Sequence, residues 1–424
     1  MTDATQSGPM LAADGTPLKQ SLARSLRRQK MRALLLIAPL LFFVLVSFII
    51  PIASMLFRSV ENSMVSETIP LTVQALQDWD ETSGELPDEA VFAAFAVDLK
   101  AAVAAKQHTR LGTRLNYEET GMSSMFRKTG RGMRKIDPNT DAPFKEKFID
   151  IHDGWGEVLT WQTIKTHSVG ITNGYFLNAV DMRRTVDGAE AQPESKQILI
   201  KLFGRTLMMS LVITSACIIL GYPVAWILAN LPMRVANLLM ILVLLPFWTS
   251  LLVRTSAWKV MLQQQGVIND TLVWLGIVAD TDRLIIINNQ IGTIVAMTHI
   301  LLPFMILPMY SVMQTIPPTY LRAAKSLGAT NWTAFWRVYF PQSVPGIGAG
   351  SILVFILAIG YYITPEIVGG TKGVFISNRI AYHISSSLNW GLAAALGTIL
   401  LAAVLILYWA YDRIVGIDNV KLGG

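Results

Sequence analysis

The sequence predicts an all-α membrane protein with six transmembrane helices and one large soluble insert after the first helix. Its 424 residues are 52% hydrophobic with a mean hydropathy of +0.44, which is too apolar for an ordinary soluble domain. Only 15% of the residues are charged, and they cluster between long apolar runs. The stretch 58–201 has a mixed-charge composition without a spanning run. The predicted parts are a cytoplasmic tail (1–32), a first span (33–57), the insert (58–201), a helical core (202–415) and a second cytoplasmic tail (416–424).

The first apolar run, Ala33–Phe57, is predicted to be a retained helix. About 25 residues are enough to cross the roughly 30 Å hydrocarbon core, and no small-x-small cleavage site follows. Five basic residues precede the run and are expected to hold the N-terminus in the cytoplasm: Arg24, Arg27, Arg28, Lys30 and Arg32. Residues 1–20 are polar and are expected to be disordered.

The insert is expected to lie outside the membrane and to fold as a small domain. The stretch Asp88–Lys106 predicts an alanine-rich helix with Phe92, Phe95 and Leu99 on one side. A small core is expected from four later aromatic residues: Trp155, Trp161, Tyr175 and Phe176. The basic run Arg127–Lys135 is interpreted as a solvated face.

Apolar runs predict the other five spans, which are Leu202–Leu231, Ala236–Val253, Asn289–Met313, Ile347–Gly369 and Trp390–Val415. With the N-terminus inside, Arg234, Arg322, Lys325, Arg337 and Arg413 also fall inside, in agreement with the positive-inside rule. Prolines interrupt most spans, as in helices that line a pathway, hinge or merely curve. Gly346, Gly348 and Gly350 are expected to permit close helix packing. The single cysteine, Cys217, lies in an apolar run, which excludes a disulfide framework or a cysteine metal site.

The stretch Tyr320–Gly346 predicts a helical elbow within the cytoplasmic loop 314–345. Pro317 and Pro318 should end the preceding helix, and Gly328 should end the next one at a position that can take positive φ. Thr330 or Asn331 can cap a second short helix that carries Phe335, Trp336 and Val338 and ends at Pro341. An ordinary amphipathic hairpin is the alternative interpretation.

The elbow resembles the cytoplasmic loop of ABC-importer membrane subunits, whose pattern is E-A-A-x3-G-x9-I-x-L-P. Ala323-Ala324, Gly328, Val338, Phe340 and Pro341 match the register, whereas Arg322 replaces the usual glutamate. The resemblance implies a type I ABC importer permease fold. It also implies that the elbow contacts an ATPase through seven residues: Arg322, Ala323, Ala324, Leu327, Gly328, Phe335 and Pro341.

Further motifs resemble the spermidine/putrescine-type (PotB-like) permeases. They occur in matching order between Leu202 and Val415: Gly221-Tyr222-Pro223-Val224-Ala225, Leu245-Pro246-Phe247-Trp248-Thr249-Ser250, Leu252-Val253-Arg254, Gly266-Val267-Ile268-Asn269, Leu302-Pro303-Phe304-Met305, Leu307-Pro308, Pro365-Glu366 and Gly369-Gly370. The insert is not typical of that group and loosely resembles the outer domain of maltose-type permeases.

This resemblance implies several partners. The sequence contains no G-x4-G-K-[ST] phosphate loop, so no cofactor is expected in this chain, and ATP and Mg²⁺ would bind a separate dimer of ATPase subunits. A PotC-like second permease would complete the pathway, and a periplasmic binding protein would deliver the substrate. The expected location is the bacterial inner membrane, in contact with lipid. The basic residues flank membrane spans, and no motif indicates nucleic-acid binding.

Five residues are candidates for the substrate pathway: Trp248, Arg254, Tyr361, Tyr362 and Glu366. Arg254 could line the outer gate or extend to the membrane interface. Glu366 could meet a cationic substrate or simply be hydrated. The tyrosines could contact amines through cation–π interactions, although helix packing explains them as well. A small amine-bearing solute is expected, with polyamine as the leading member. His299 is expected to form a structural hydrogen bond.

Other classes of function agree less well with the sequence. A secondary transporter of small organic solutes is the alternative, but inverted repeats and paired ionisable residues are not visible. A membrane-anchored enzyme would need clustered catalytic groups, and the insert offers only the adjacent pair His152-Asp153. An ion channel would need a selectivity-filter segment, and the sequence has none that resembles one.

Overall fold

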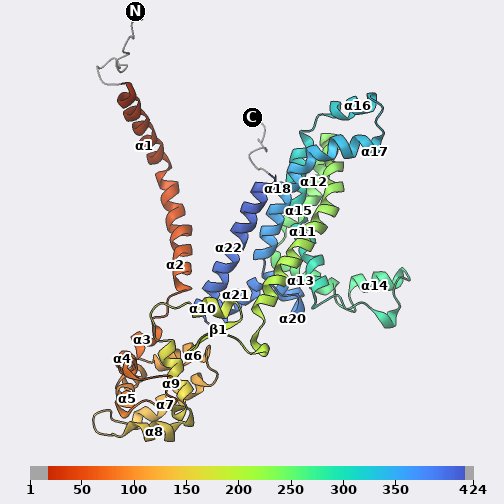
Figure 1. The fold of residues 1–424 in the computed structure, drawn as a ribbon. Helices are drawn as coiled ribbons and strands as arrows, with labels where there is room; N and C mark the ends of the chain where they lie inside the picture. Colours follow the sequence, from red (N-terminus) through yellow and green to blue (C-terminus); the bar gives the residue numbers. More distant parts are fainter. Residues whose placement is uncertain (1–17, 416–424) are drawn as a thin grey trace, which may run out of the picture. The chain divides into compact units, whose positions relative to one another are not determined.

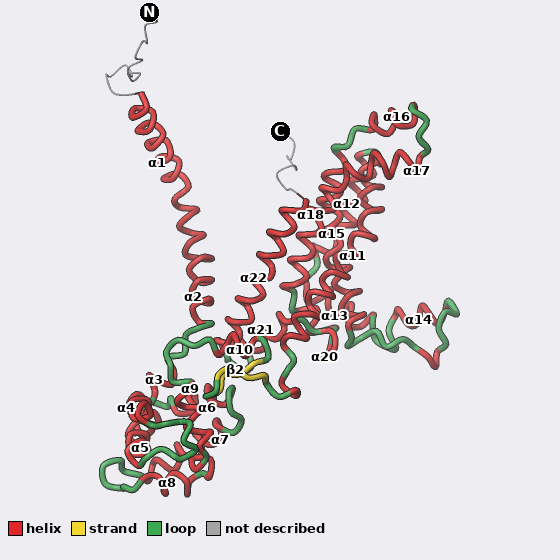
Figure 2. The backbone as a smooth tube through the Cα atoms, in the orientation of Figure 1, coloured by secondary structure: helices red, strands yellow, loops and turns green. Residues whose placement is uncertain are grey.

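The computed structural model describes residues 18–415, which are helical apart from short turns, loops and one two-stranded hairpin (Figures 1 and 2). The chain divides into two units, Met1–Phe57 and Arg58–Gly424, and each is described by itself. The predicted tail 416–424 and most of the segment expected to be disordered, residues 1–17, lie outside the described residues.

The first unit is a helical rod with one irregular turn. Helix α1 (Leu18–Val44) continues through a π-helical turn (Leu45–Ile49) into α2 (Ile50–Arg58). The segment Ser25–Arg58 is long and apolar enough to cross a membrane. The helix therefore begins before the predicted first span, and its N-terminal turns carry the basic residues.

The insert contains eight short helices and the only hairpin among the described residues. Their bounds are α3 (Met64–Thr68), α4 (Pro70–Ala75), α5 (Glu89–Ala104), α6 (His108–Asn116), α7 (Met122–Gly132), α8 (Phe144–Ile151), α9 (Val158–Thr166), α10 (Gly174–Ala179), β1 (Met182–Thr185) and β2 (Gly188–Ala191). The strands pair antiparallel, with Met182 opposite Ala191 and Thr185 opposite Gly188.

An aromatic cluster forms the core of the insert. Phe92 and Phe95 on α5 are fully buried, and each packs against Trp161, with ring centroids 4.6 and 5.5 Å apart. The indole nitrogens of Trp155 and Trp161 donate hydrogen bonds to Thr129 Oγ1 (2.8 Å) and to the Trp155 carbonyl (3.1 Å). The expected α5 helix and the burial of both tryptophans are thus confirmed, and burial of such rings is a large stabilising contribution.

The core of the second unit is a helical bundle. Its elements are α11 (Leu199–Asn230), α12 (Met233–Leu244), α13 (Leu251–Met261), α14 (Val267–Trp274), α15 (Gln290–Gln314), α16 (Pro318–Ser326), α17 (Asn331–Ala334), α18 (Phe340–Gly360), α19 (Ile363–Val368), α20 (Gly370–Gly373), α21 (Ile376–Ser385) and α22 (Trp390–Val415). Helices α11, α15 and α18 pack against one another, and α22 lies beside them (Figure 1). Five helices across the described chain could each span a membrane, and one bent pair would make a sixth.

Small residues allow the close approach of α18 to α15. A Cβ atom added at Gly350 would lie 2.7 Å from Met305 Sδ, and one at Gly346 would lie 3.0 Å from the Met309 Cα. The predicted role of glycine at the start of the fifth span is confirmed at these two positions.

Two of the predicted spans have the wrong shape. The third, Ala236–Val253, is broken into Met233–Trp248 and Leu251–Met261, which meet at 93°. Pro246 lies in a 3₁₀ turn (Leu245–Trp248), and Thr249 and Ser250 are extended, so the helical hydrogen bonds stop there. The fifth span runs over Asn331–Gly360 rather than Ile347–Gly369, because the helix ends before Tyr361.

The insert is tied to the bundle at three places. The Asp181 carboxylate accepts hydrogen bonds from the backbone N–H groups of Ile198, Leu199 and Ile200 at 3.1, 3.0 and 2.9 Å, so it caps α11. The Tyr175 ring packs so closely on Gly391 that a Cβ there would lie 2.3 Å from the ring. The Tyr117 hydroxyl donates to the Ser387 carbonyl. Tyr175 and Phe176 thus pack against α22 rather than in the aromatic core, which corrects that part of the prediction.

Candidate coupling surface and membrane pathway

The first half of the elbow is α16, which ends in a Schellman motif. Gly328 has φ +87°, and its N–H donates to the Lys325 carbonyl at 3.0 Å. The Ala329 N–H donates to the Ala324 carbonyl at 3.0 Å. These two bonds satisfy carbonyls that the helix end leaves free, and only glycine takes the left-handed conformation without strain. The predicted positive φ at Gly328 is confirmed.

The second half of the elbow continues into a membrane span. Thr330 caps α17, because its Oγ1 accepts a hydrogen bond from the Thr333 N–H at 3.2 Å. A π-helical turn (Phe335–Tyr339) then joins α17 to α18. The prediction that the helix ends at Pro341 is wrong. Pro341 falls in the first turn of α18, directly after the π turn, where a missing N–H is tolerated.

Most of the elbow's surface is exposed. Leu327 is 90% exposed and Trp332 71%, and Tyr320 and Trp336 are also exposed. Arg322, Ala323, Gly328 and Pro341 are exposed as well, whereas Ala324 and Phe335 are half-buried. The elbow lies at one end of the bundle, with α16 and α17 beyond the ends of α12 and α15 (Figure 1). We call the exposed set Tyr320, Arg322, Ala323, Leu327, Gly328, Trp332 and Trp336 the elbow surface.

Aromatic packing fixes the elbow to the bundle. Phe335 stacks on Tyr339 with ring centroids 5.9 Å apart, and the Tyr222 ring on α11 contacts both Phe335 (6.1 Å) and Phe340 (5.8 Å). The Tyr222 hydroxyl lies 3.0 Å from Ser343 Oγ. A displacement of the elbow would therefore be transmitted to α11 and α18, which contribute to the centre of the bundle.

The second feature is the helix break that follows Gly360. Pro365 has no N–H, so it cannot donate to the carbonyl four residues earlier, which belongs to Tyr361. That carbonyl instead accepts a hydrogen bond from Ser377 Oγ at 2.6 Å. Asn378 Nδ2 donates to the Tyr362 carbonyl at 2.8 Å. Side chains of α21 thus satisfy the backbone groups of the break, as interrupted membrane helices require.

Glu366 is held at the same break. Asn378 Nδ2 donates a second hydrogen bond to Glu366 Oε2 at 2.7 Å. Glu366 is an exposed residue, and its other oxygen forms no hydrogen bond within residues 18–415. Tyr362 is also exposed, and its backbone carbonyl accepts a hydrogen bond from the same Asn378 amide. The break therefore presents the oriented carboxylate of Glu366, whose second oxygen is available to accept a hydrogen bond.

Arg254 lies on α13 next to Thr255, and Tyr361 directly follows the end of α18. The Nε atom of Arg254 is buried without a partner in the described chain. His299 Nδ1 accepts a hydrogen bond from Trp258 Nε1 at 3.1 Å, which confirms the structural role predicted for His299. Thr255 and Thr364 join α13 to α19 through hydroxyls 3.1 Å apart.

The structure thus brings Tyr361, Tyr362 and Glu366 together at the break after Gly360. Arg254 lies on α13, which contacts α19 through the Thr255–Thr364 hydroxyl pair. Trp248 is 79% exposed and has no ring or hydrogen-bond contact with any of them in the described part of the chain. Sequence reasoning missed Asn378, Ser377, Thr255 and Thr364. The sequence gives little indication of their role, because each is a common polar residue in a segment without a motif.

Comparison with known proteins identifies the class. Residues 203–415 match the family described as "Binding-protein-dependent transport system inner membrane component". The chain belongs to this family, and it is a multi-pass, non-enzymatic permease subunit of an ABC importer.

Individual proteins and solved structures are similar to parts of the chain. The chain is 37% identical over 212 residues to the spermidine/putrescine transport system permease protein PotB of Escherichia coli (strain K12), covering 49% of this chain and 76% of that protein. It is 33% identical over 222 residues to the inner membrane ABC transporter permease protein YdcU of the same organism, covering 50% and 70%. A bacterial alginate ABC transporter structure aligns with a TM-score of 0.43 and 18% identity, over 53% of this chain and 80% of that chain.

Proposed function

We propose that this permease subunit imports small amine-bearing organic cations, with polyamines as the leading members. The observation that carries the proposal is the carboxylate of Glu366, which Asn378 orients at the break after Gly360 while one oxygen stays free. An ammonium group is a matching donor for that oxygen. The name of the relative PotB, a spermidine/putrescine permease, supports the same substrate class.

Aromatic side chains at the break are suited to the same ligand. Tyr361 and Tyr362 flank the point where α18 ends, and Tyr362 is exposed. An ammonium group over a tyrosine ring gains roughly 0.5–2 kcal/mol, depending on its hydration. One carboxylate and two aromatic rings therefore form a weak cation site. Weak binding is useful in a pathway, since the substrate must leave as readily as it enters.

A zwitterionic amine is the second candidate. Arg254 has a buried nitrogen without a partner among residues 18–415, and it lies on α13, which contacts α19 through the Thr255–Thr364 hydroxyl pair. A carboxylate on the substrate would be a suitable acceptor for that guanidinium. Amino acids, opines and betaines combine such a carboxylate with a cationic nitrogen.

The proposed mechanism is alternating access driven by a separate ATPase. The elbow surface would dock into a dimer of ATP-binding subunits, which hold ATP and Mg²⁺. Closure of that dimer would move α16 and α17, and the ring contacts of Phe335 with Tyr222 would pass the movement to α11. A PotC-like second permease would supply the other half of the pathway, and a periplasmic binding protein would deliver the substrate.

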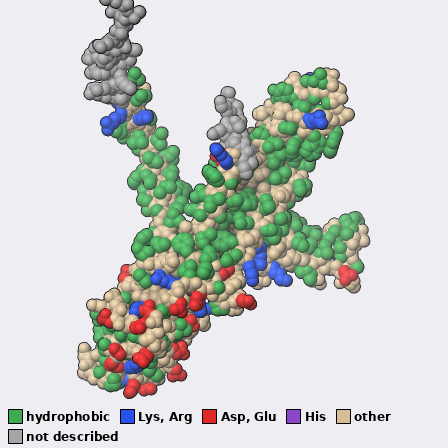
Figure 3. All heavy atoms as spheres, viewed as in Figure 1, with side chains coloured by type: hydrophobic (Ala, Val, Ile, Leu, Met, Phe, Trp, Pro, Cys, Tyr) green, Lys and Arg blue, Asp and Glu red, His purple; other side chains and the backbone are tan. Residues whose placement is uncertain are grey.

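The proposed topology places both termini and the elbow in the cytoplasm and the insert in the periplasm. It is supported by the basic residues Arg322, Lys325 and Arg337 on the elbow segment, which lies at one end of the bundle. In Figure 3 apolar side chains cover the bundle helices, whereas acidic and basic side chains gather on the insert. This is the distribution of a membrane-embedded core with a solvated outer domain.

Uptake by the complete transporter in proteoliposomes tests the substrate class. Labelled putrescine and spermidine are expected to accumulate inside the vesicles when ATP is supplied to the ATPase. Unlabelled amino acids, opines and betaines are added as competitors. If these competitors do not reduce the uptake of the labelled amines, the result supports polyamines as the substrates. Strong competition by zwitterions would favour the second candidate.

The Glu366→Gln variant tests the carboxylate itself. It is expected to lower the uptake of the preferred cation by several-fold, since an amide keeps the shape and removes the charge. Asp187→Asn removes a charge from the exposed turn between β1 and β2 and serves as the control. Equal uptake by Glu366→Gln and wild type would assign recognition to the binding protein instead.

A further inference from the structure

A cavity of about 490 Å³ lies where the insert meets the first turn of α22. Four separate parts of the second unit line it: the segment Arg58–Met64, helix α6 with Tyr117, Tyr175 on α10, and the stretch Leu388–Gly391 that leads into α22. The proposed transport function does not use this cavity, whose lining shares no residue with the elbow surface or with the break after Gly360.

The lining is rich in cations. It contains Arg58, Arg110 and Arg114 against one carboxylate, Glu61. Arg58 and Arg110 form no ion pair within the described chain. The Arg58 guanidinium lies 5.9 Å from the Trp390 ring centre. Because the arginines outnumber the single carboxylate of the lining, the cavity favours an anionic ligand.

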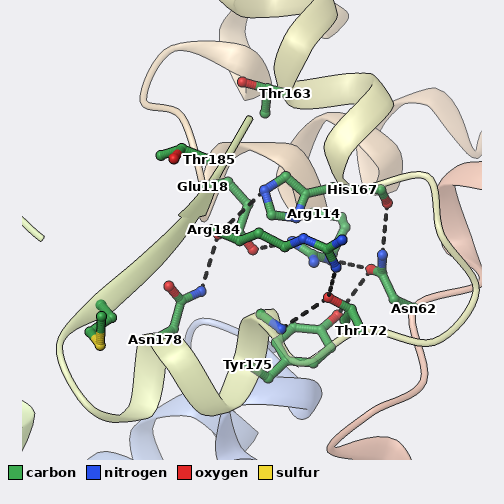
Figure 4. Close-up of polar contacts among 12 residues, drawn as sticks. Asn62, Arg114, Glu118, Thr163, His167, Thr172, Tyr175, Asn178, Arg184 and Thr185 are labelled. Atoms are coloured by element: carbon green, nitrogen blue, oxygen red, sulfur yellow. Dashed lines mark hydrogen bonds and ion pairs between the residues drawn. The ribbon is translucent and has the colours of Figure 1, made fainter. Parts of the chain in front are cut away.

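The third cation is built into a buried network (Figure 4). Arg114 is only 5% exposed. Its Nε donates to Asn62 Oδ1 at 3.0 Å, and its Nη1 pairs with Glu118 Oε1 at 2.7 Å. The guanidinium also lies 4.8 Å from the Tyr175 ring centre. The network fixes the orientation of Arg114 independently of any ligand.

One donor of this fixed guanidinium is left over. Arg114 Nη2 is buried and has no hydrogen-bond partner in the part of the chain that the structure describes. A buried donor without an acceptor is unfavourable, so natural structures seldom retain one without a reason. Arg114 also lines the cavity, so its fixed positive charge favours an anionic group bound there.

The N-terminus of α22 faces the same cavity. Asn389, Trp390 and Gly391 are part of the lining. Asn389 Oδ1 accepts from the Leu392 N–H at 3.2 Å, which leaves the N–H groups of Trp390 and Gly391 without a hydrogen-bond partner in residues 18–415. The first N–H groups of a long helix and its dipole attract anions.

Two residues of the lining are end residues of candidate membrane spans. Arg58 ends the apolar helix Ser25–Arg58, and Trp390 begins the span Trp390–Arg413. Arginine and tryptophan at such positions mark the headgroup level of a bilayer. We propose that the cavity binds a phosphate group, with the headgroup of an anionic phospholipid as the source to test first and free phosphate as the other.

The test measures binding to the full chain in neutral detergent, with labelled phosphatidylglycerol, phosphatidylcholine and inorganic phosphate as separate probes. Phosphatidylglycerol is expected to bind more tightly than phosphatidylcholine. The variants Arg58→Gln and Arg110→Gln should each weaken its binding by about tenfold, the usual loss for one charge-assisted contact. Both side chains are exposed, so the fold should survive, and helical circular dichroism checks this.

Arg134→Gln is the matched control, since Arg134 is an exposed arginine of the insert outside the cavity. Its binding of phosphatidylglycerol should equal that of wild type. Saturable binding of inorganic phosphate that depends on Arg58 and Arg110 would support the site and identify its ligand as a solute. Equal losses in all three variants, or equal binding of both lipids without phosphate binding, would overturn the proposal.

Discussion

Asn378 on α21 and Glu366 on α19 are joined by a hydrogen bond of 2.7 Å beside the break between α18 and α19. The same amide nitrogen donates to the Tyr362 carbonyl at 2.8 Å, and Asn378 Oδ1 accepts from the Phe375 N–H at 2.9 Å. One side chain on α21 thereby caps its own helix, satisfies the interrupted helix and orients the proposed cation-binding carboxylate.

The variant Asn378→Asp should destabilise this arrangement while it keeps the helix cap. The new carboxylate can still accept from the Phe375 N–H, but it loses both donor hydrogen bonds and lies beside Glu366. We expect a loss of about 1–3 kcal/mol in the free energy of unfolding, as for an unsatisfied polar group. Thermal unfolding in detergent measures it.

A double variant separates charge repulsion from the lost hydrogen bonds. Adding Glu366→Gln to Asn378→Asp removes the like charge and supplies an amide donor, so it should restore most of the lost thermal stability. No recovery in the double variant would show that the two side chains do not interact.

The Schellman motif at Gly328 leads to a prediction about coupling. Gly328→Val places a β-branched residue at φ +87°, a strain of roughly 1–2 kcal/mol that should unwind the end of α16. We expect the variant to reach the membrane but to retain less ATPase on co-purification and to lose most uptake. Gly276→Val is the control. Gly276 also has positive φ, +69°, and no atom lies near its Cβ position, but it follows α14 outside the elbow. Uptake that falls equally in both variants would contradict a coupling role.

The two halves of the elbow show how far sequence reasoning reaches. A glycine after a helical stretch signals a left-handed C-terminus through local sterics alone, so Gly328 was predicted correctly. Pro341 was interpreted by the same local rule, and the result was wrong. The π turn Phe335–Tyr339 depends on packing of Phe335 and Phe340 against Tyr222, and this contact spans more than a hundred residues.

The pathway break follows the same logic. Apolar length identified the spans, but length does not locate the residue at which a helix stops. Pro365 leaves the carbonyl of Tyr361 without its helical N–H donor. The helix can stop there because Ser377 and Asn378 donate hydrogen bonds to the carbonyls of Tyr361 and Tyr362. The cavity at Arg58 was also beyond sequence reasoning, since its lining comes from four distant segments.

The junction between the insert and α11 provides a stability prediction. Asp181 accepts three hydrogen bonds from the first N–H groups of α11, and it does so from a backbone with φ +57°. Asp181→Ala should cost about 1–2 kcal/mol, the range found for lost helix caps. Asp181→Asn keeps an acceptor oxygen and tolerates the left-handed backbone, so its loss should be smaller. Thermal unfolding compares both with Asp187→Ala, which removes an exposed carboxylate and should be neutral.

The last prediction concerns the buried pair His167 and Glu118, whose Nε2 and Oε2 atoms are 3.9 Å apart. Burial, together with the positive charges of Arg114 and Arg184, lowers the pKa of His167 to about 4 against the opposing effect of Glu118. For Glu118, burial raises the pKa, but the charges of His167 and Arg114 and hydrogen bonds from Asn178 and Arg114 outweigh it, so its pKa is lowered. At neutral pH His167 is therefore uncharged, and Arg114 is the cation that pairs with Glu118.

Because the pKa of His167 is lower in the folded chain than the ordinary 6.5, the unfolded chain binds more protons between pH 6.5 and 4. The stability that neutral His167 contributes is fully present above pH 6.5 and is lost as the pH falls toward 4. The maximum effect is about 3 kcal/mol. Hydrogen–deuterium exchange of α9 in the full chain, corrected for the intrinsic pH dependence, should show weaker protection at pH 5 than at pH 7. His167→Gln should reduce this pH dependence, whereas His152→Gln, which changes a histidine outside the network, should keep it. An identical pH profile for wild type and His167→Gln would rule out His167 as the titrating group.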